Sequence, residues 1–484
     1  MKSNEGQIAI LNPYEASKFC DEGIRKRFAI LEKILKNRSQ FHSVGTFYQE
    51  LEDTIRLRFL QSLKNPGVRS AIALRIYALK LLVESSLAHC SNMSKLPINE
   101  ETKEQLIKLA QEIVILSYLS EFFRYCRYKV EDIPEPLLIV DESSGECGLI
   151  IPGEIIASQI RMHISAYLLE SSSKIRAIEK EEVSTFEELV EIIYKDELKD
   201  AFKKRFGINI RDAVKFTEYI ARTAEGLKVE PLGRFKRVIE RNLRIPENKI
   251  KKVIELFECK KEYLESVFGE EKGHYKLFNN PFSLLRKPFV KLKHGGKRYI
   301  VYGPYTVLYA LVVFLSDIDR GFIPLGEVSN KLREKYGKLF EQKLREILQK
   351  HGLTVLHPKK IPPGEIDALI YDEQKKLAVV IEAKAHRTDV SPRDLWFQIK
   401  KENEEWVKKL ERKLEWIQQH HRELNLHEVE KVHGVIVTLG PLYAYTSEKD
   451  IEIITFVQLP EVLEKVGINV PEALKKELFL DFSV

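Results

Sequence analysis

The chain has 484 residues, of which 44% are hydrophobic and 31% charged, with a formal net charge of +6. This composition excludes a disordered chain and predicts a globular protein with room for two or three domains. No apolar run approaches the roughly 20 residues that cross a bilayer, and the first residues lack the form of a secretory signal. We therefore expect a cytoplasmic protein that does not act at a membrane.

The basic surplus lies in the first two thirds of the chain. From Lys331 onward, 26 basic residues balance 26 acidic ones; taken from the totals of 78 and 72, this leaves 52 basic against 46 acidic residues before it. Such a modest excess permits nucleic-acid binding without demonstrating it.

The first elements in chain order are helices. Apolar residues recur at steps of three and four through Phe47, Leu51, Ile55 and Phe59, and this pattern predicts that residues 15–130 are mostly helical.

A change in composition marks the first domain edge. Residues 131–153 contain three prolines and a polar Asp-Glu-Ser-Ser-Gly run, which predicts a loop or small hairpin. Helical patterning then resumes, so we expect two helical regions, 1–150 and 151–270. These regions could serve as an interaction platform for protein partners.

Two short amphipathic segments in the second region leave two interpretations open. Residues 234–243 and 247–257 flank Arg244-Ile245-Pro246. This spacing fits a helix-turn-helix, and it equally fits two antiparallel helices of a bundle.

A basic stretch follows, and residues 271–328 are expected to form a hairpin and a connecting segment. No Asp or Glu occurs from Lys272 to Ser316, and apolar residues alternate on both sides of Gly295-Gly296. This pattern predicts a β-hairpin, because two glycines tolerate the positive φ angles of a tight turn. Its basic residues either contact phosphates or form an ordinary solvated face; they are Lys291, Lys293, Lys297 and Arg298.

The last segment, residues 329–484, alternates between helix and strand. A helix over 329–350 ends before Gly352, which is typical of a helix C-cap. The elements predicted after it are strands over 353–357, 365–371 and 377–384, a long amphipathic helix over 391–424, and strands over 435–438 and 451–457.

Two carboxylates and a lysine stand out among these strands. Glu382 and Lys384 share one face of their strand because side chains alternate. A hairpin can bring Asp367 beside Glu382, although the sequence leaves the register open. Two neighbouring carboxylates repel each other and favour a hard divalent cation such as Mg²⁺, and a nearby ammonium can stabilise charge that develops on phosphorus.

This pattern resembles the PD-(D/E)xK nuclease superfamily, and within it the restriction-endonuclease-like and Holliday-junction-resolvase-like members. The resemblance rests on Gly364-Glu365-Ile366-Asp367 and on Val379-Val380-Ile381-Glu382-Ala383-Lys384, and it covers about 130 residues of the last third. Glu365-Ile366-Asp367 stands where the superfamily's name has Pro-Asp, a replacement that many members share.

The resemblance implies an α/β restriction-endonuclease-like domain with an α-β-β-β-α-β core, here preceded by a large, mainly α-helical region. It also implies Mg²⁺ or Mn²⁺ held by Asp367 and Glu382 directly and by Glu341 through water. Lys384 would be the catalytic lysine, and Gln398 matches a glutamine that some relatives carry on the next helix.

We therefore expect a metal-dependent DNA endonuclease, acting in defence against foreign DNA or in DNA repair. The alternatives are a non-catalytic nucleic-acid-binding module and an interaction platform that recruits a nuclease. RNA as the substrate and a homodimer both stay open. The sequence contains no GxxxxGK[ST] phosphate loop, so ATP-driven movement would need a partner protein.

Overall fold

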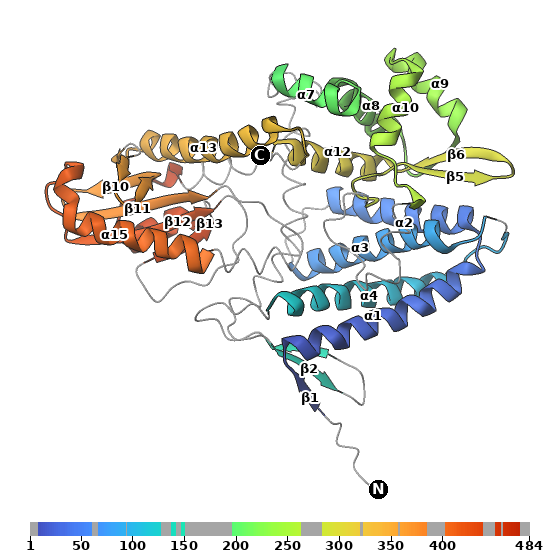
Figure 1. Ribbon diagram of the computed structural model, residues 1–484, viewed down its shortest axis with the longest axis horizontal. Helices are drawn as coiled ribbons and strands as arrows, with labels where there is room; N and C mark the ends of the chain where they lie inside the picture. Colours follow the sequence, from blue (N-terminus) through green and yellow to red (C-terminus); the bar gives the residue numbers. More distant parts are fainter. Residues whose placement is uncertain are drawn as a thin grey trace, which may run out of the picture. The chain divides into compact units, whose positions relative to one another are not determined.

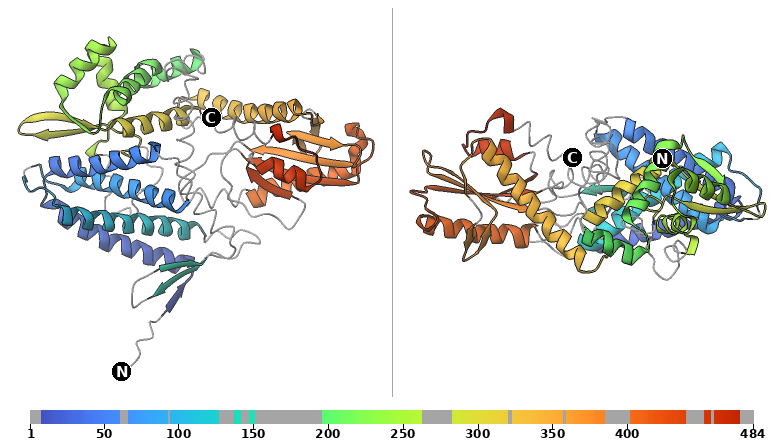
Figure 2. Two further views of the ribbon diagram at one scale, coloured as in Figure 1. Left: turned by 180° about the vertical axis from the view of Figure 1, so that it is seen from behind. Right: turned by 90° about the horizontal axis from the view of Figure 1, so that it is seen from above.

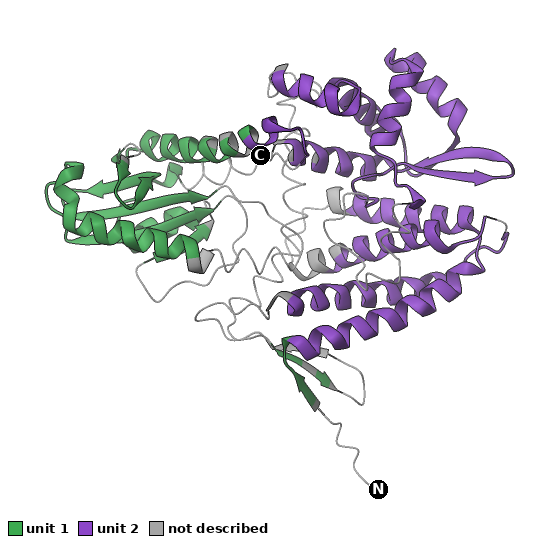
Figure 3. Cartoon of the chain, in the orientation of Figure 1, with its two compact units in different colours: residues 1–13, 125–170, 331–484 green, residues 14–124, 171–330 purple. Residues whose placement is uncertain are grey.

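Two compact units make up the chain (Figure 3). We call residues 14–124 and 171–330 the helical unit, and residues 1–13, 125–170 and 331–484 the sheet unit. None of the described helices is both long and apolar enough to cross a membrane. The computed structural model describes residues 8–60, 66–92, 94–126, 137–141, 147–150, 196–262, 283–319, 323–356, 359–384, 402–438, 451–455 and 458–474.

Four long helices begin the helical unit, as the apolar periodicity predicts. Figures 1 and 2 show α2, α3, α4 and α1 side by side in that order. Ion pairs join α1 to α4: Arg27 lies 2.6 Å from Glu112, and Arg124 lies 2.9 Å from Asp21. The four helices are α1 (Pro13–Lys36), α2 (Gln40–Leu60), α3 (Pro66–His89) and α4 (Glu100–Cys126).

Five further helices and a small sheet are described in the second half of this unit. A strand that the sequence did not predict, β4, interrupts the expected helical region and pairs with β6 in a sheet of order β4-β6-β5. The hairpin around Gly295-Gly296 is confirmed, and both glycines have positive φ. The elements are α7 (Asp196–Phe206), α8 (Ile210–Thr223), β4 (Lys228–Pro231), α9 (Leu232–Leu243), α10 (Glu247–Leu256), β5 (Val290–His294), β6 (Lys297–Tyr302) and α12 (Pro304–Asp319).

Buried carboxylates connect distant segments of the helical unit. Glu52 of α2 is 1% exposed and accepts hydrogen bonds from the first turn of α12, from the backbone of Tyr305 (2.6 Å) and Thr306 (3.0 Å). Glu84 of α3 accepts one from the backbone of Leu284 (2.8 Å). A carboxylate at a helix N-terminus satisfies N–H groups that have no partner within the helix.

The sheet unit contains a mixed five-stranded sheet of order β13-β12-β11-β10-β7. Strands β7, β10 and β11 pair antiparallel, whereas β11, β12 and β13 pair parallel. Helix α13 (Glu327–Lys350) covers one face and α15 (Lys408–His420) the other (Figure 1). The strands are β7 (Val355–Leu356), β10 (Ala368–Asp372), β11 (Leu377–Lys384), β12 (Lys431–Thr438) and β13 (Ile451–Thr455).

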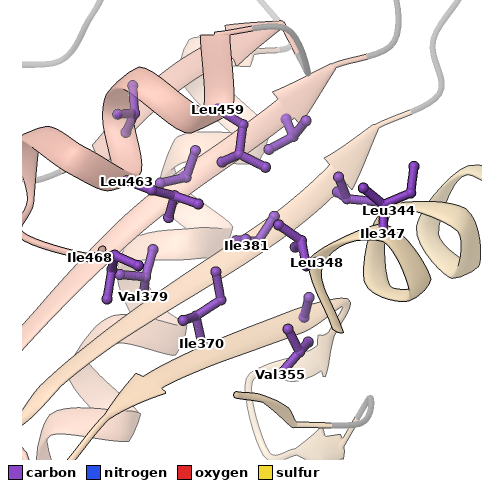
Figure 4. Close-up of a cluster of buried hydrophobic side chains, with 14 of the residues drawn as sticks. Leu344, Ile347, Leu348, Val355, Ile370, Val379, Ile381, Leu459, Leu463 and Ile468 are labelled. Atoms are coloured by element: carbon purple, nitrogen blue, oxygen red, sulfur yellow. The ribbon is translucent and has the colours of Figure 1, made fainter. Parts of the chain in front are cut away.

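Alternating side chains of β11 build a core on each side of this sheet. Val379 and Ile381 pack with α13 and with α16 (Leu459–Lys465), as Figure 4 shows. Val380 faces α15, where it packs with Leu410 and Ile417. The odd-numbered positions therefore belong to one core, and the even-numbered positions lie on the side of α15.

The predicted strand over 365–371 is broken at Asp367. Its first part, β9 (Gly364–Ile366), pairs with β8 (Lys359–Ile361) across the Pro362-Pro363 turn, and only β10 joins the large sheet. The guanidinium of Arg345 on α13 donates a 2.8 Å hydrogen bond to the carbonyl oxygen of Asp367. The carbonyl is therefore bonded to α13 rather than to a neighbouring strand. The local sequence does not predict this contact.

The structure also departs from the sequence prediction near the start of the chain. Residues 8–11, 137–141 and 147–150 form a three-stranded sheet, β1 (Ile8–Leu11), β2 (Leu137–Asp141) and β3 (Cys147–Ile150), inside what was expected to be a helical region. The β2–β3 pair agrees with the predicted hairpin, whereas β1 pairs with β2 from a distant part of the chain.

Candidate active site

Strands β10 and β11 bring the two predicted carboxylates together. Ala368 pairs with Ile381, and this register places Asp367 beside Glu382 at the same end of the two strands. Both side chains are buried, with 8% and 6% of their surface exposed. Buried carboxylates are costly unless they are hydrogen-bonded, paired or bound to a cation, so their convergence at one edge of the sheet indicates a site.

Lys384 bridges the two acids. Its ammonium lies 2.8 Å from Oε2 of Glu382 and 3.5 Å from Oδ2 of Asp367. The same Oδ2 accepts a 2.8 Å hydrogen bond from the backbone N–H of Ala383. The three residues that the sequence pattern singled out are therefore in mutual contact, at the end of the sheet's central strand.

A second lysine, which sequence reasoning missed, completes this cluster. Lys413 of α15 is 5% exposed and contacts Oε1 of Glu382 and the carbonyl oxygen of Glu365. The mixture of lysines and glutamates on this helix predicts a solvated face that includes Lys413, and this prediction is wrong for Lys413. A signal existed: Trp406, Leu410 and Ile417 form the buried stripe of this helix, and position 413 falls on that stripe at helical spacing.

Glycines allow α15 to approach the sheet closely enough for this contact. At Gly364, whose φ is +139°, an added Cβ would lie 3.4 Å from Cε of Lys413. At Gly434 on β12, an added Cβ would lie 2.9 Å from the side chain of Leu414 and 3.0 Å from that of Leu410. At Gly364 a larger residue would be disfavoured by the positive φ, and at Gly434 it would force the side chains of Leu410 and Leu414 to shift.

Burial and mutual repulsion shift the pKa values of the acids. Burial, followed by the charge of Glu382, raises the pKa of Asp367, while Lys384 and the Ala383 N–H oppose this shift. Glu341 reaches the site from α13, and burial together with the charge of Asp367 raises the pKa of Glu341 to about 7. The cluster therefore carries more negative charge than its surroundings readily stabilise, which is the electrostatic condition that a cation relieves.

The pKa of Lys384 moves the other way. Burial lowers it, but the charges and hydrogen bonds of Glu382 and Asp367 outweigh burial and raise the pKa above its ordinary value. The ammonium therefore stays charged at neutral pH.

The donor set fits a small oxygen-binding cation in part. Mg²⁺ is held in many proteins by one or two carboxylates, with waters and substrate phosphates as the remaining ligands. Asp367 and Glu382 meet this requirement. Among the described residues, no three His, Cys, Asp or Glu side chains gather closely enough to form a metal site, and Glu341 acts on Asp367 electrostatically.

The remaining predicted residues lie elsewhere or outside the described part of the chain. Gln398 belongs to residues 385–401, which the structure does not describe. The four basic residues of the hairpin lie on β5 and β6 in the helical unit, and Lys291 is paired with Glu258 at 2.7 Å.

Comparisons with known proteins give no match: neither a family model, nor a curated protein, nor a solved structure resembles the chain closely enough to be assigned to it.

Proposed function

We propose that the chain is a metal-dependent phosphodiesterase that cleaves DNA at the cluster of Asp367, Glu382 and Lys384. One observation carries the proposal: two buried carboxylates and a charged lysine, predicted from a PD-(D/E)xK-like pattern, meet at the ends of adjacent strands. The sheet with a helix on each face is compatible with a restriction-endonuclease-like domain.

Each residue has a distinct role in this proposal. Asp367 and Glu382 would hold Mg²⁺ or Mn²⁺, which supplies a Lewis acid and a more acidic bound water. Lys384 places a fixed positive charge where negative charge develops on the phosphate during attack. Glu341 adds a third carboxylate at the rim of the site. Lys413 holds Oε1 of Glu382 until a metal takes its place.

The deciding experiment is a cleavage assay with the full-length chain. Supercoiled, linear and branched DNA and RNA are incubated with Mg²⁺, with Mn²⁺ or with EDTA. We expect cleavage of at least one DNA form in either metal, none in EDTA, and none with Asp367→Asn. A protein that cuts no substrate in either metal would refute the proposal.

A second candidate function has one observation in its favour. Both carboxylate oxygens of Glu382 are already held by lysine ammonium groups. A cluster neutralised in this way can serve as a salt-bridge core of a domain that binds nucleic acid without cutting it. Equal DNA binding by wild type and by Lys384→Met, with no cleavage by either protein, would select this alternative.

A further inference from the structure

A basic, concave surface lies in the helical unit between α9, α10 and the β5–β6 hairpin. Five basic and two acidic side chains line it. Lys291 is paired with Glu258, Lys236 with Glu247 and Lys251 with Glu255, so the excess positive charge lies on Lys293 and Arg298. Its charged residues are Lys236, Lys251, Lys291, Lys293 and Arg298, with Glu258 and Glu262. An excess of this sign suits a polyanion.

The tip of the hairpin carries like charges in direct opposition. Lys293 pairs across the strands with Arg298, and Lys297, which pairs with His294, lies next to the turn on the other face. All three side chains are exposed, and no acidic side chain in the described part of the chain forms an ion pair with them. Like charges directly opposite each other destabilise a β-hairpin. These like charges lie on a hairpin that other contacts hold firmly. We therefore expect an external anion to bind them and offset their repulsion.

Aromatic contacts hold the hairpin in place on both of its faces. Tyr299 packs against Phe41 of α2 with ring centroids 5.5 Å apart, and His294 stacks on Phe41 at 4.5 Å. Tyr302 is 5% exposed and packs against Phe235. Of these rings, only His294 is exposed, so the hairpin lacks the row of exposed aromatic rings that is usual in single-strand binding.

Helix α10 presents a polar face beside this hairpin. Ile250, Val253 and Ile254 bury its inner side, whereas Asn248 and Lys251 point outward from its first two turns. Only three residues separate it from α9, with Arg244 in the left-handed region at φ 55°.

Two helices joined in this way can distinguish B-form DNA from A-form RNA. In a helix-turn-helix, the second helix enters the major groove and its N-terminal residues reach the base edges. The major groove of B-form DNA is about 12 Å wide and admits a helix. The major groove of A-form RNA is deep and narrow, and side chains cannot read it.

We propose that α10 and the β5–β6 hairpin form a binding site for B-form duplex DNA. Helix α10 enters the major groove, and Lys293, Lys297 and Arg298 contact phosphates of the adjoining backbone. This site is separate from the cleavage site, and DNA binding at it does not depend on cleavage.

Fluorescence anisotropy with the full-length chain in EDTA tests the site without cleavage. The probes are a labelled DNA duplex, one of its single strands, and an RNA duplex of the same sequence, each titrated at several salt concentrations. The hairpin variant is Lys293→Glu, Lys297→Glu and Arg298→Glu, with the corresponding Gln substitutions as a milder form. The helix variant is Asn248→Glu with Lys251→Glu. The matched control reverses three exposed charges of α1, Arg25, Lys26 and Lys33.

We expect the DNA duplex to bind more tightly than either other probe. Each lost phosphate contact lowers the salt slope by about 0.9, so the hairpin variant should lose roughly 2.7. The helix variant should bind the duplex at least about tenfold more weakly, about 1.4 kcal/mol, while the α1 control and Asp367→Asn should bind as wild type does.

Three results would overturn the proposal. The first is equal or tighter binding of single-stranded DNA or duplex RNA. The second is an unchanged salt slope in both hairpin variants, or a loss of equal size in the α1 control. The third is full duplex affinity in the helix variant. Because binding is measured in EDTA, none of these outcomes bears on whether the sheet unit cleaves DNA.

Discussion

Glu52 of the helical unit and Glu382 of the sheet unit are both buried carboxylates, but different donors satisfy them. In the helical unit, Glu52 is held by two backbone N–H groups and the hydroxyl of Thr306. In the sheet unit, Glu382 is held by the ammonium groups of Lys384 and Lys413. Backbone donors are fixed by the fold, whereas an ammonium on a flexible side chain can move away when another cation arrives.

This difference separates a structural charge from a charge that can take part in chemistry. Removing Glu52 would leave buried N–H groups without a partner, so its effect should appear in stability. Removing a residue of the sheet-unit cluster should appear in activity, because burial and the charge of Glu382 raise the pKa of Asp367, and such shifts are common at functional sites.

The largest expected effect is that of Asp367→Ala. We expect Mg²⁺-dependent cleavage to disappear while the unfolding midpoint in urea stays close to that of wild type, because relief of the repulsion with Glu382 offsets the loss of the hydrogen bond from the Ala383 N–H. Glu373→Gln, in the exposed turn at the other end of β10, is the matched control and should keep full activity. Cleavage by the Asp367→Ala variant would remove this residue from the metal site.

Lys384→Met should lower the rate by about a hundred- to a thousand-fold, or roughly 2.7–4 kcal/mol of transition-state stabilisation. DNA affinity should change little, because the charge acts mainly on the transition state. Single-turnover rates and equilibrium binding separate the two quantities. Lys431→Met, an exposed position at the start of β12, serves as the control. A loss of affinity as large as the loss of rate would make Lys384 a binding residue.

In the helical unit, Glu52→Ala should lower the free energy of unfolding by about 2–3 kcal/mol, since the first turn of α12 loses its acceptor. Urea unfolding followed by circular dichroism measures the change. The neighbouring Asp53 is exposed, and Asp53→Ala should stay within about 0.5 kcal/mol of wild type. If both variants were equally stable, backbone donors would not be what satisfies this buried charge.

The smallest expected effect concerns Lys413→Met. Removing the ammonium that holds Oε1 of Glu382 takes away a competitor for the metal. The Mg²⁺ concentration for half-maximal cleavage should therefore fall, by about tenfold or less, which corresponds to roughly 1.4 kcal/mol. A metal titration of the cleavage rate measures it. A higher Mg²⁺ requirement would show instead that Lys413 mainly orients Glu382 for the metal.

The alternation of apolar and polar residues was enough to predict the strands whose ends carry the site. Alternation placed Glu382 and Lys384 on one face of β11, and the glycine pair located the β5–β6 hairpin. These features depend on neighbours within a few residues, and the sequence displays them directly.

Features that depend on distant partners could not be predicted in this way. At the break, the carbonyl of Asp367 is bonded to Arg345 of helix α13. Residues 228–231 form the strand β4 by pairing with β6, which lies about 70 residues later in the chain. Lys413 was misinterpreted for a different reason: a lysine is usually solvated, and its burial follows only once Glu382 is known to face α15.

The parallel pairing of β11 with β12 has a consequence for folding order. Glu382 pairs with Ile436 and Lys384 with Thr438, and a parallel connection requires a long crossover before the two strands can meet. Pairing over such a separation forms late, because the intervening chain must first be ordered. The β10–β11 hairpin that carries the carboxylates can form before β12 is made. We expect the sheet around them to be completed only after β12 has left the ribosome, and protease resistance of ribosome-arrested chains of increasing length would reveal the step. Synthesis itself would then delay the appearance of cleavage activity.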